Sequence, residues 1–392
     1  MTMSDQPTTD ATVASITPEA LKDRIDEPDG DVFLLDVRSE SDFAEWRIEG
    51  AETVNYPYFE LLDGIPEALA EQLPEDRQIT VLCAKGGSSE MIAENLQEAG
   101  YDVDHLERGM KGWARIYEYQ ELDVDADATV AQYRRPSSGC LAYFVADGDE
   151  AAVIDPLRAF TDEYVQDARA LGVDLTYALD THIHADHVSG IRALAAETGA
   201  TPVLPEAADD RGVEYDREYE TVGDGDTITV GDTDIEVLHT PGHTTGMTAY
   251  KVGDVLFTGD GLFTESVARP DLEDPDAAKD AARTLYESLQ EQVLPLPDDT
   301  VIAPAHFSES ATANDDGSYT AELGDLVDRM DALTMDEEPF VEFIVKGMPP
   351  RPANYEEIIA ANLGREAPDD ETAFELELGP NNCAASEEAM TD

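Results

Sequence analysis

Short apolar runs alternate with amphipathic helical patterns over the first third of the chain. Residues 32–37 and 79–82 are almost wholly apolar and too short for helices, which is typical of parallel strands buried on both faces. Residues 91–100 show helical spacing of apolar positions and end in glycine, and Thr17 followed by proline marks a helix start. This alternation predicts a small α/β domain with a parallel sheet.

Beyond residue 130 the pattern changes to short β-rich runs, most of them followed by Gly, Pro, His or Asp. These runs are residues 152–154, 176–179, 227–230, 235–238, 255–257 and 301–302. The stretch 121–130 is acidic and turn-prone, and the chain from about residue 367 is acidic and thinly apolar, which predicts a mostly unstructured tail. The expected organisation is a flexible N-terminus (1–15), a first domain (16–121), a linker (122–130), a second domain (131–366) and an acidic tail (367–392).

The charge restricts the classes of partner. The 392 residues include 88 Asp and Glu against 24 Lys and Arg, which gives a formal net charge of −64. Such a surface repels phosphate backbones and anionic lipid head groups, and no basic patch offsets it, so neither nucleic acid nor a membrane surface is an expected partner. Acidity spread along the whole chain, with arginine outnumbering lysine threefold, resembles the proteins of salt-in halophiles. A generic acidic protein is the alternative.

The cysteines favour a reducing compartment. Cys83, Cys140 and Cys383 are odd in number and widely spaced, so they predict no disulfide framework, and a cytoplasmic protein fits best. The first 15 residues lack the basic and apolar regions of a signal peptide, and no window of 18 apolar residues predicts a membrane span. We expect Cys140 to be structural, and Cys383 receives no role.

The histidines are concentrated in the second domain, which holds six of the seven. A dense cluster follows the predicted strand 176–179 and contains His182, His184, Asp186 and His187. At a period of two, His182 and His184 project the same way, and the next two donors turn back toward them. Four imidazole and carboxylate donors within six residues are what a zinc or iron site requires.

Three further donors each stand just beyond a predicted strand. They are His243, Asp260 and His306. In this order and spacing the seven donors resemble the metallo-β-lactamase superfamily over roughly residues 130–365. That resemblance implies an αββα sandwich with the metal at one edge. It also implies one metal site on His182, His184 and His243 and a second on Asp186, His187 and His306, with Asp260 available to bridge.

The subfamily resemblance favours sulfur chemistry. The stretch 181–190, the residues 304–306, and Arg269 with its neighbours after Asp260 look more like the persulfide dioxygenases than the glyoxalase II hydrolases. The dioxygenase resemblance implies a single Fe(II) on His182, His243 and Asp260, with open positions for O₂ and a persulfide sulfur, and Arg269 as a substrate contact. The hydrolase resemblance implies two zinc ions and a bridging hydroxide. Both kinds of enzyme carry the same seven donors, so both metal contents stay open.

Cys83 lies between an apolar strand and an amphipathic helix. Backbone N–H groups and a helix N-terminus converge at such a position and stabilise a thiolate and a bound anion. A buried structural cysteine is the alternative. Together with the stretches 34–38, 48–51 and 106–113, the loop resembles a rhodanese domain over residues 15–120. The resemblance implies that Cys83 accepts a sulfane sulfur and that the loop residues Lys85, Gly86, Gly87 and Ser88 bind the transferred anion.

These observations predict a metal-dependent enzyme of sulfur metabolism. It would oxidise a low-molecular-weight thiol persulfide with O₂ to sulfite, and Cys83 would supply sulfane sulfur or combine it with sulfite as thiosulfate. A dizinc hydroxyacyl-thioester hydrolase of glyoxalase II type with an ancillary rhodanese domain is the first alternative. A non-catalytic sulfur-binding or scaffold protein is the second. A homo-oligomer is compatible with the sequence.

Overall fold

A computed structural model describes residues 13–27, 30–62, 64–308, 310–346 and 348–385. The chain divides into two compact units, with the division between Ile116 and Tyr117. We describe each unit by itself. The N-terminal segment 1–15 was expected to be flexible. Residues 1–12 lie outside the described residues, and residues 14–16 form a strand.

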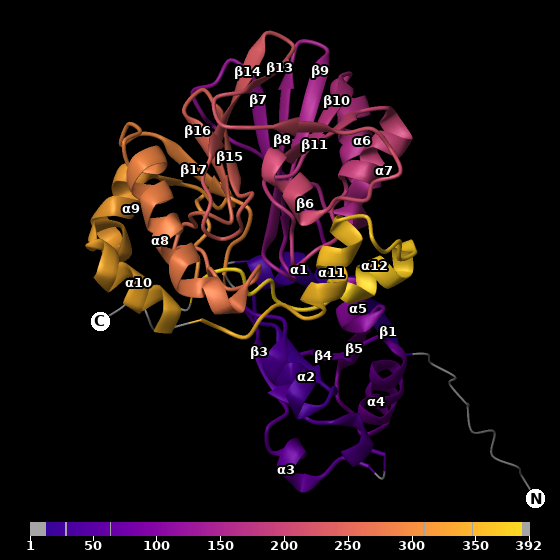
Figure 1. The fold of residues 1–392 in the computed structure, drawn as a ribbon. Helices are drawn as coiled ribbons and strands as arrows, with labels where there is room; N and C mark the ends of the chain where they lie inside the picture. Colours follow the sequence, from indigo (N-terminus) through magenta and orange to yellow (C-terminus); the bar gives the residue numbers. More distant parts are fainter. Residues whose placement is uncertain (1–12, 28–29, 63, 309, 347, 386–392) are drawn as a thin grey trace, which may run out of the picture. The chain divides into compact units, whose positions relative to one another are not determined.

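The first unit is built on one parallel sheet, coloured indigo to violet in Figure 1. Its described strands are β1 (Ala14–Ile16), β2 (Phe33–Asp36), β3 (Glu52–Asn55), β4 (Ile79–Leu82) and β5 (Val103–Leu106), in the order β1-β5-β4-β2-β3. Its helices are α1 (Pro18–Asp26), α2 (Glu40–Glu45), α3 (Glu67–Ala70), α4 (Gly87–Glu98) and α5 (Gly109–Trp113), with a 3₁₀ turn η1 (Tyr58–Glu60). Thr17 caps α1 by accepting a hydrogen bond from the N–H of Ala20, as its position before proline predicts. The predicted parallel α/β domain is confirmed.

The second unit contains two facing sheets. In the described residues the first sheet has the order β12-β11-β10-β9-β8-β7-β6 and the second β13-β14-β15-β16-β17-β18. The first consists of β6 (Glu118–Glu121), β7 (Thr129–Arg135), β8 (Cys140–Asp147), β9 (Glu150–Ile154), β10 (Asp174–Leu179), β11 (Thr201–Pro205) and β12 (Glu220–Val222). The second consists of β13 (Thr227–Val230), β14 (Thr233–His239), β15 (Thr248–Val252), β16 (Val255–Gly259), β17 (Val301–Pro304) and β18 (Ala321–Glu322).

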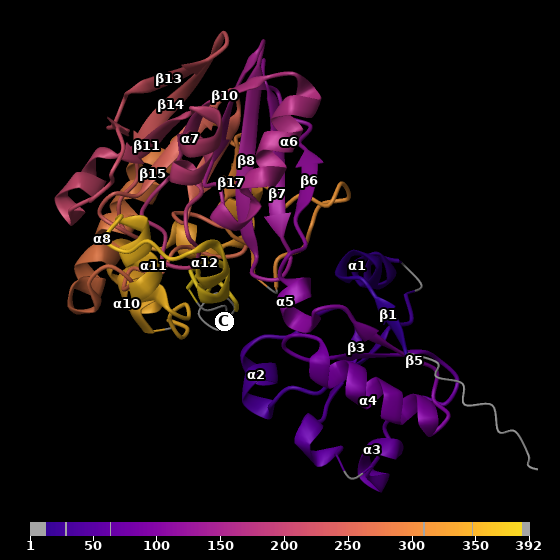
Figure 2. The same ribbon diagram turned by 90° about the vertical axis from the view of Figure 1, so that its right-hand side faces the viewer.

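Helices cover the outer faces of both sheets. The first sheet carries α6 (Thr161–Leu171) and α7 (Ile191–Thr198), and the second carries α8 (Ala278–Ser288), α9 (Leu323–Arg329) and α10 (Glu337–Lys346) (Figure 1). In the turned view as well, α11 (Tyr355–Asn362) and α12 (Asp370–Leu376) lie together at one end of the sandwich (Figure 2). Short 3₁₀ turns are η2 (Arg158–Phe160), η3 (Glu206–Arg211), η4 (Pro275–Ala277) and η6 (Asp331–Thr334), and η5 (Leu289–Val293) is π-helical. The predicted αββα sandwich is confirmed.

Three apolar clusters hold these layers together. One fills the space between the two sheets and includes Tyr143, Val237 and Phe257. The other two lie between each sheet and its covering helices. Strands that are buried on both faces read as continuous apolar runs, which explains why the sequence pattern located β9, β16 and β17. In β13, exposed and buried residues alternate instead. The rigid sandwich thereby fixes the loops that follow these strands.

Two expectations about organisation differ from the structure. The stretch 122–130, expected as a linker, connects β6 to β7, which pair antiparallel within the second unit. The acidic stretch therefore connects two paired strands of the second unit. The boundary between the two units lies before it, between residues 116 and 117. The tail from residue 367 was expected to be mostly unstructured, and this is wrong for residues 370–385. They form α12 and a following segment, and several of their apolar side chains, among them Phe374 and Cys383, are buried.

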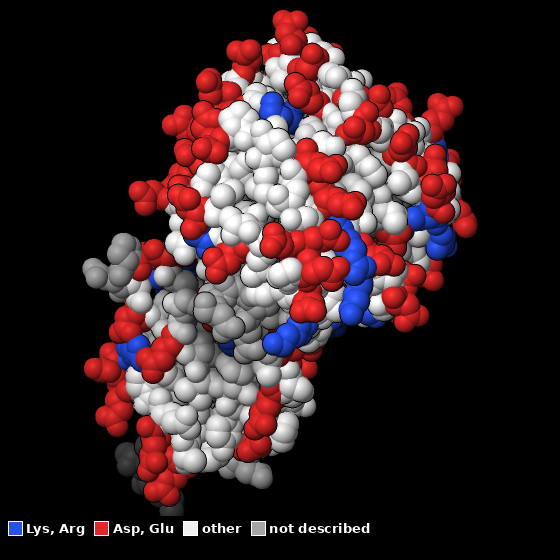
Figure 3. Space-filling view, turned by 60° about the vertical axis from the view of Figure 1, so that its left-hand side comes forward, with Lys and Arg blue, Asp and Glu red and all other residues white. Residues whose placement is uncertain are grey.

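Acidic side chains are spread over the surface. Figure 3 shows Asp and Glu scattered over the visible face, with few Lys and Arg between them. Within the described part of the chain, no helix is long and apolar enough to cross a membrane.

Candidate metal centre and cysteine loop

The seven predicted metal donors lie in four loops that each follow a strand. The cluster at 182–187 follows β10, His243 follows β14, Asp260 follows β16 and His306 follows β17. All seven are buried, with at most 6% of any residue exposed. The side chain of Asn362, at the end of α11, donates hydrogen bonds to the carbonyls of His184 (3.0 Å) and His187 (2.8 Å) and so fixes the first loop. The structure brings the seven together in adjoining groups.

His182, His243 and Asp260 form the first group. The Nε2 atoms of the two histidines lie 3.6 Å and 3.4 Å from Oδ2 of Asp260. Nδ1 of His243 donates to the carbonyl of Arg269 (2.8 Å), and Nδ1 of His182 is 3.0 Å from the hydroxyl of Thr181. These contacts fix both rings so that Nε2 is directed toward Asp260.

The chemistry of this first group suits a metal ion. Nε2 of His182 and Oδ2 of Asp260 are buried and have no hydrogen-bond partner among the described residues. Burial lowers the pKa of His182 and of His243, so both rings are neutral, which is the form that binds metals. Two imidazole nitrogens and one carboxylate oxygen are the donor set of a facial triad, which leaves coordination positions open.

His184 lies outside the first group. Its Nε2 is 3.0 Å from Oδ1 of Asp155 and 3.8 Å from Oδ1 of Asp180. Asp155 also accepts hydrogen bonds from the backbone N–H (2.7 Å) and the hydroxyl (2.9 Å) of Thr181. Burial raises the pKa of Asp180 to about 6. His184 is therefore not among the donors grouped with His182, although its Nδ1 is buried without a hydrogen-bond partner among the described residues. The sequence reasoning missed Asp155 and Asp180, although each directly follows a strand and could have been found by that rule.

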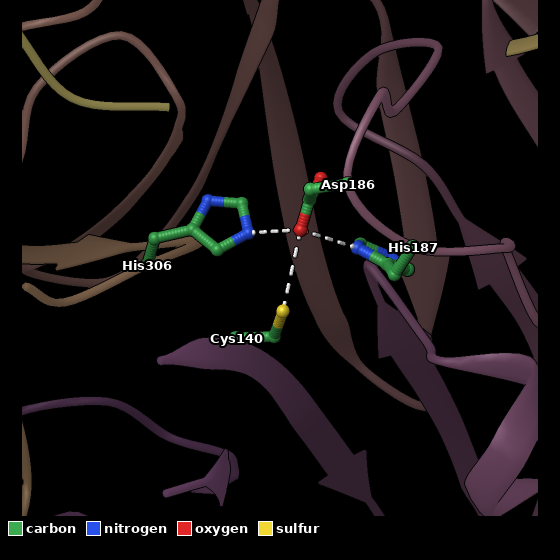
Figure 4. Close-up of side chains that lie close together, drawn as sticks. All are labelled: Cys140, Asp186, His187 and His306. Atoms are coloured by element: carbon green, nitrogen blue, oxygen red, sulfur yellow. Dashed lines mark hydrogen bonds and ion pairs between the residues drawn. The ribbon is translucent and has the colours of Figure 1, made fainter. Parts of the chain in front are cut away.

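The second group contains Asp186, His187, His306 and a residue that was expected to be only structural, Cys140 (Figure 4). Oδ2 of Asp186 is surrounded by Nε2 of His306 at 2.7 Å, Nδ1 of His187 at 3.1 Å and Sγ of Cys140 at 3.2 Å. The hydroxyl of Ser138 donates to Sγ of Cys140 over 3.0 Å. Cys140 is the first residue of β8, and its backbone bridges to His306, which explains the proximity.

His306 joins the two groups. Its Nδ1 donates to Oδ1 of Asp260 over 2.5 Å, and its Nε2 donates to Oδ2 of Asp186 over 2.7 Å. Burial acts to lower the pKa of His306, but the two carboxylates outweigh burial and raise it well above its ordinary value. The same contacts lower the pKa of both aspartates against the effect of their burial. The ring is therefore a cation between two carboxylates, and Oδ2 of Asp260 stays available to the first group.

The last described segment of the chain covers the first group from another side. Cys383 is fully buried, and its sulfur lies within 4.8 Å of donor atoms of Asp260 and His306. Burial raises the pKa of its thiol well above the ordinary value. Backbone contacts hold this segment beside residues 266–269, including a bridge between Ala268 and Ala384. No role for Cys383 could be predicted from the sequence, because the neighbouring residues are acidic and thinly apolar.

Arg269, expected as a substrate contact, is engaged within the protein. Its guanidinium is 1% exposed, binds both oxygens of Asp271 at 2.7 Å and 3.1 Å, and donates to the carbonyls of Pro350 (2.8 Å) and Asn382 (2.9 Å). Its own carbonyl accepts the hydrogen bond from His243. In this conformation Arg269 orients a metal donor and anchors the segment around Cys383.

The Cys83 loop of the first unit forms a backbone cradle. The N–H groups of Gly86 and Ser89 point at Sγ of Cys83 over 3.1 Å and 3.4 Å, and the hydroxyl of Ser89 is 3.4 Å from the same sulfur. Gly86 has a positive φ of +97. The 12-residue helix α4 begins at the next residue, Gly87, so its N-terminus lies at the loop. Such a cradle stabilises a thiolate or an anion at the sulfur.

The other predicted loop residues lie around this cradle. Lys85 is exposed, Gly87 is the first residue of α4, and Ser88 is half-buried on its first turn. The loop packs against α5, where the N–H of Met110 donates to the carbonyl of Cys83 over 2.8 Å. A Cβ at Gly109 would lie 1.9 Å from that carbonyl oxygen, and its φ is +55, so glycine is required there. This close approach explains the 106–113 signature.

Comparison with known proteins agrees with this architecture. The metallo-beta-lactamase superfamily model matches residues 136–306, and the rhodanese-like domain model matches residues 17–116. The mitochondrial persulfide dioxygenase ETHE1 of Bos taurus is 31% identical over 251 residues, which cover 62% of this chain and 91% of that protein. The hydroxyacylglutathione hydrolase of Brucella anthropi is 34% identical over 180 residues, covering 43% of this chain and 65% of that protein. A crystal structure of a metallo-beta-lactamase from Staphylococcus aureus superposes with a TM-score of 0.55 at 28% identity, covering 60% and 72% of the two chains.

Proposed function

Because the chain belongs to the metallo-beta-lactamase superfamily and carries a rhodanese-like domain, we propose that it is an iron-dependent sulfur dioxygenase with a sulfurtransferase cysteine. The substrate is a low-molecular-weight thiol persulfide. Persulfide, O₂ and water give the free thiol, sulfite and two protons, so that the outer sulfur receives three oxygen atoms. Similarity to the persulfide dioxygenases over 91% of the length of the bovine protein supports this choice.

The observation that carries the proposal is the geometry of His182, His243 and Asp260. Nε2 of His182 and Nε2 of His243 lie 3.6 Å and 3.4 Å from Oδ2 of Asp260. Nε2 of His182 and Oδ2 of Asp260 are buried without a hydrogen-bond partner among the described residues. Separations of this size are short enough for all three atoms to bind one metal ion. A bound Fe(II) supplies open coordination positions and the electrons that activate O₂.

The protein's own residues position this centre. The carbonyl of Arg269 fixes the ring of His243, and His306 holds one oxygen of Asp260 so that the other faces the two histidines. Burial of all the donors excludes bulk water, which protects a reactive sulfur from side reactions.

Cys83 carries the second activity. The sulfur lies in a cradle of two N–H groups at the start of α4, an arrangement suited to binding an anion. The Cys83 thiolate attacks the sulfane sulfur of thiosulfate, forms a persulfide and releases sulfite; in the reverse direction, a Cys83 persulfide and sulfite give thiosulfate. Sulfite from the metal centre is thus an acceptor for sulfur carried on Cys83.

A dizinc thioester hydrolase is the second candidate. The group of Asp186, His187 and His306 beside the first group favours it, because two metal ions need six or more donors. Against it, the similarity to the hydroxyacylglutathione hydrolase covers 65% of that protein, whereas the similarity to the persulfide dioxygenase ETHE1 covers 91% of that protein.

A matched pair of histidine variants tests the proposal. His243→Gln should lose the iron and the formation of sulfite from a thiol persulfide, because it removes a triad nitrogen. His184→Gln, in the same cluster and equally buried, should keep most of its iron. Iron is measured by atomic emission and sulfite by derivatisation. Loss of iron in both variants, or thioester cleavage without sulfite, would contradict the proposal.

A further inference from the structure

Four tyrosines of the second unit lie in ring contact with one another, and we call them the tyrosine row. Tyr164 lies in α6, Tyr133 in β7 and Tyr119 in β6, and Tyr117 immediately precedes β6. The ring of Tyr133 is stacked on that of Tyr117, with centroids 5.3 Å apart. Tyr133 also meets the rings of Tyr164 and Tyr119 edge-on, at 4.8 Å and 5.3 Å. The four rings therefore form one continuous path with Tyr133 at its centre.

The tyrosine row extends from the loop of metal donors to the surface. At the inner end, the buried hydroxyl of Tyr164 accepts the backbone N–H of Leu157 over 3.0 Å, and Leu157 forms a β-bridge with Ser189 in the loop that carries the donors. Cys140, which belongs to the second group of donors, packs in the same apolar cluster as Tyr164. At the outer end, Tyr119 is 39% exposed. The row thus connects the surroundings of the metal centre with solvent.

The inner hydroxyls of the row have hydrogen-bond partners that can take part in proton transfer. Tyr133 donates to Oδ2 of Asp167 over 2.7 Å, and the hydroxyls of Tyr117 and Tyr164 lie 2.5 Å apart. A phenol gives up an electron readily only if its proton moves to a base at the same time, because the phenol radical cation is a strong acid. Asp167, which is half-buried, is such a base at the centre of the row.

Packing alone does not require this composition. Phenylalanine would fill nearly the same space and would bring no buried hydroxyl that needs a partner. Tyrosine differs from phenylalanine in that an oxidant can remove one electron and one proton from it and so move a radical from ring to ring. A centre that consumes O₂ generates such an oxidant when no substrate is there to receive the oxygen.

We propose that the tyrosine row is an electron relay that protects the metal centre when O₂ reacts without a persulfide. The relay rests on the proposed function, which supplies the oxidant. Each electron moves inward along the rings, and Tyr119, oxidised last, releases its proton to solvent. A low-molecular-weight thiol then gives one electron and one proton to the Tyr119 phenoxyl radical, and two thiyl radicals combine as a disulfide. Two thiols thereby deliver two electrons to the centre and two protons to solvent.

Electron paramagnetic resonance tests the relay. Iron(II)-loaded protein without persulfide is mixed with hydrogen peroxide and frozen, and the expected tyrosyl radical signal should narrow in protein made with ring-deuterated tyrosine. A thiol added before freezing should quench the signal in wild-type protein. Tyr133→Phe, which separates Tyr119 from the rest of the row, should lose this quenching and the oxidation of Tyr119 found by peptide mass spectrometry. Tyr286→Phe is the matched control, because its ring packs on Phe340 in another cluster.

Three results would overturn the relay. They are no tyrosyl signal in iron-loaded wild-type protein, the same signal in metal-free protein, or equal quenching by the thiol in Tyr133→Phe and Tyr286→Phe. Iron content and sulfite formation from a thiol persulfide are measured on the same preparations. Sulfite without a tyrosyl signal refutes the relay alone, and a quenchable signal without sulfite refutes the proposed oxidation alone. Protein that binds no iron refutes both.

Discussion

Replacing Glu377 by alanine tests whether the last described segment is part of the larger unit's core. The Glu377 carboxylate forms an ion pair with Arg135 over 2.9 Å, and both side chains are 1% exposed. Its other oxygen accepts the backbone N–H of Val188 over 2.9 Å, immediately after His187. The substitution removes both interactions and opens a small cavity beside the loop that holds the metal donors.

The expected cost follows from these contacts. Removing one partner of a buried ion pair costs about 3–5 kcal/mol, and a buried N–H that loses its acceptor adds about 1–3 kcal/mol. Arg135 keeps contacts with the rings of Phe160 and Phe374, at 5.4 Å and 5.2 Å, which limit the loss. We therefore expect Glu377→Ala to lower the free energy of unfolding of the larger unit by about 4 kcal/mol.

Urea unfolding followed by circular dichroism measures this change, in one high-salt buffer for all variants. The matched control is Asp370→Ala, which removes the ion pair between Arg158 and Asp370. That pair is slightly shorter, 2.7 Å, but the side chain of Asp370 is 94% exposed. Exposed pairs contribute about 1 kcal/mol or less, so the control should shift the midpoint little. Equal, small shifts in both variants would show that the segment around Glu377 is not packed as described.

The remaining predictions concern the cysteine loop and the surface. Cys83→Ala should abolish sulfur transfer from thiosulfate to cyanide and leave persulfide oxidation in place, and retained transfer would contradict the role of Cys83. Gly109→Ala should reduce that transfer strongly, because its Cβ meets the Cys83 carbonyl, whereas Gly100→Ala, at φ +100 but in open space, should cost only stability. With a net charge of −64, the thermal midpoint should rise from dilute buffer to molar KCl, and an unchanged midpoint would refute the halophile interpretation.

The sequence located elements wherever burial on both faces produced an unbroken apolar run. The runs at 79–82 and 255–257 lie in β4 and β16, and the donors after strands end up at one edge of the sandwich. Such donors can be predicted because the residue that follows a strand lies at the edge of the sheet, whatever the rest of the chain does. Asp155 also directly follows a strand, β9, and could have been identified in the same way. Its role became clear only from its contact with His184.

Features that depend on distant pairing could not be read in this way. Cys140 approaches Asp186 because β8 brings its first residue beside His306, 166 positions later in the chain. Residues 370–385 read as an acidic tail because average composition hides a few apolar side chains and the buried pair of Glu377 with Arg135. The division of donors into two groups likewise depends on which ring nitrogen each carboxylate contacts, which no spacing in the sequence encodes.

The central claim is a single catalytic iron on His182, His243 and Asp260. The most direct test measures metal content, O₂ uptake and sulfite release together on protein purified anaerobically and given a thiol persulfide. The account predicts about one iron per chain in the first group and one sulfite formed for each O₂ consumed. Two zinc ions per chain, no O₂ uptake and cleavage of a hydroxyacyl thioester would contradict it.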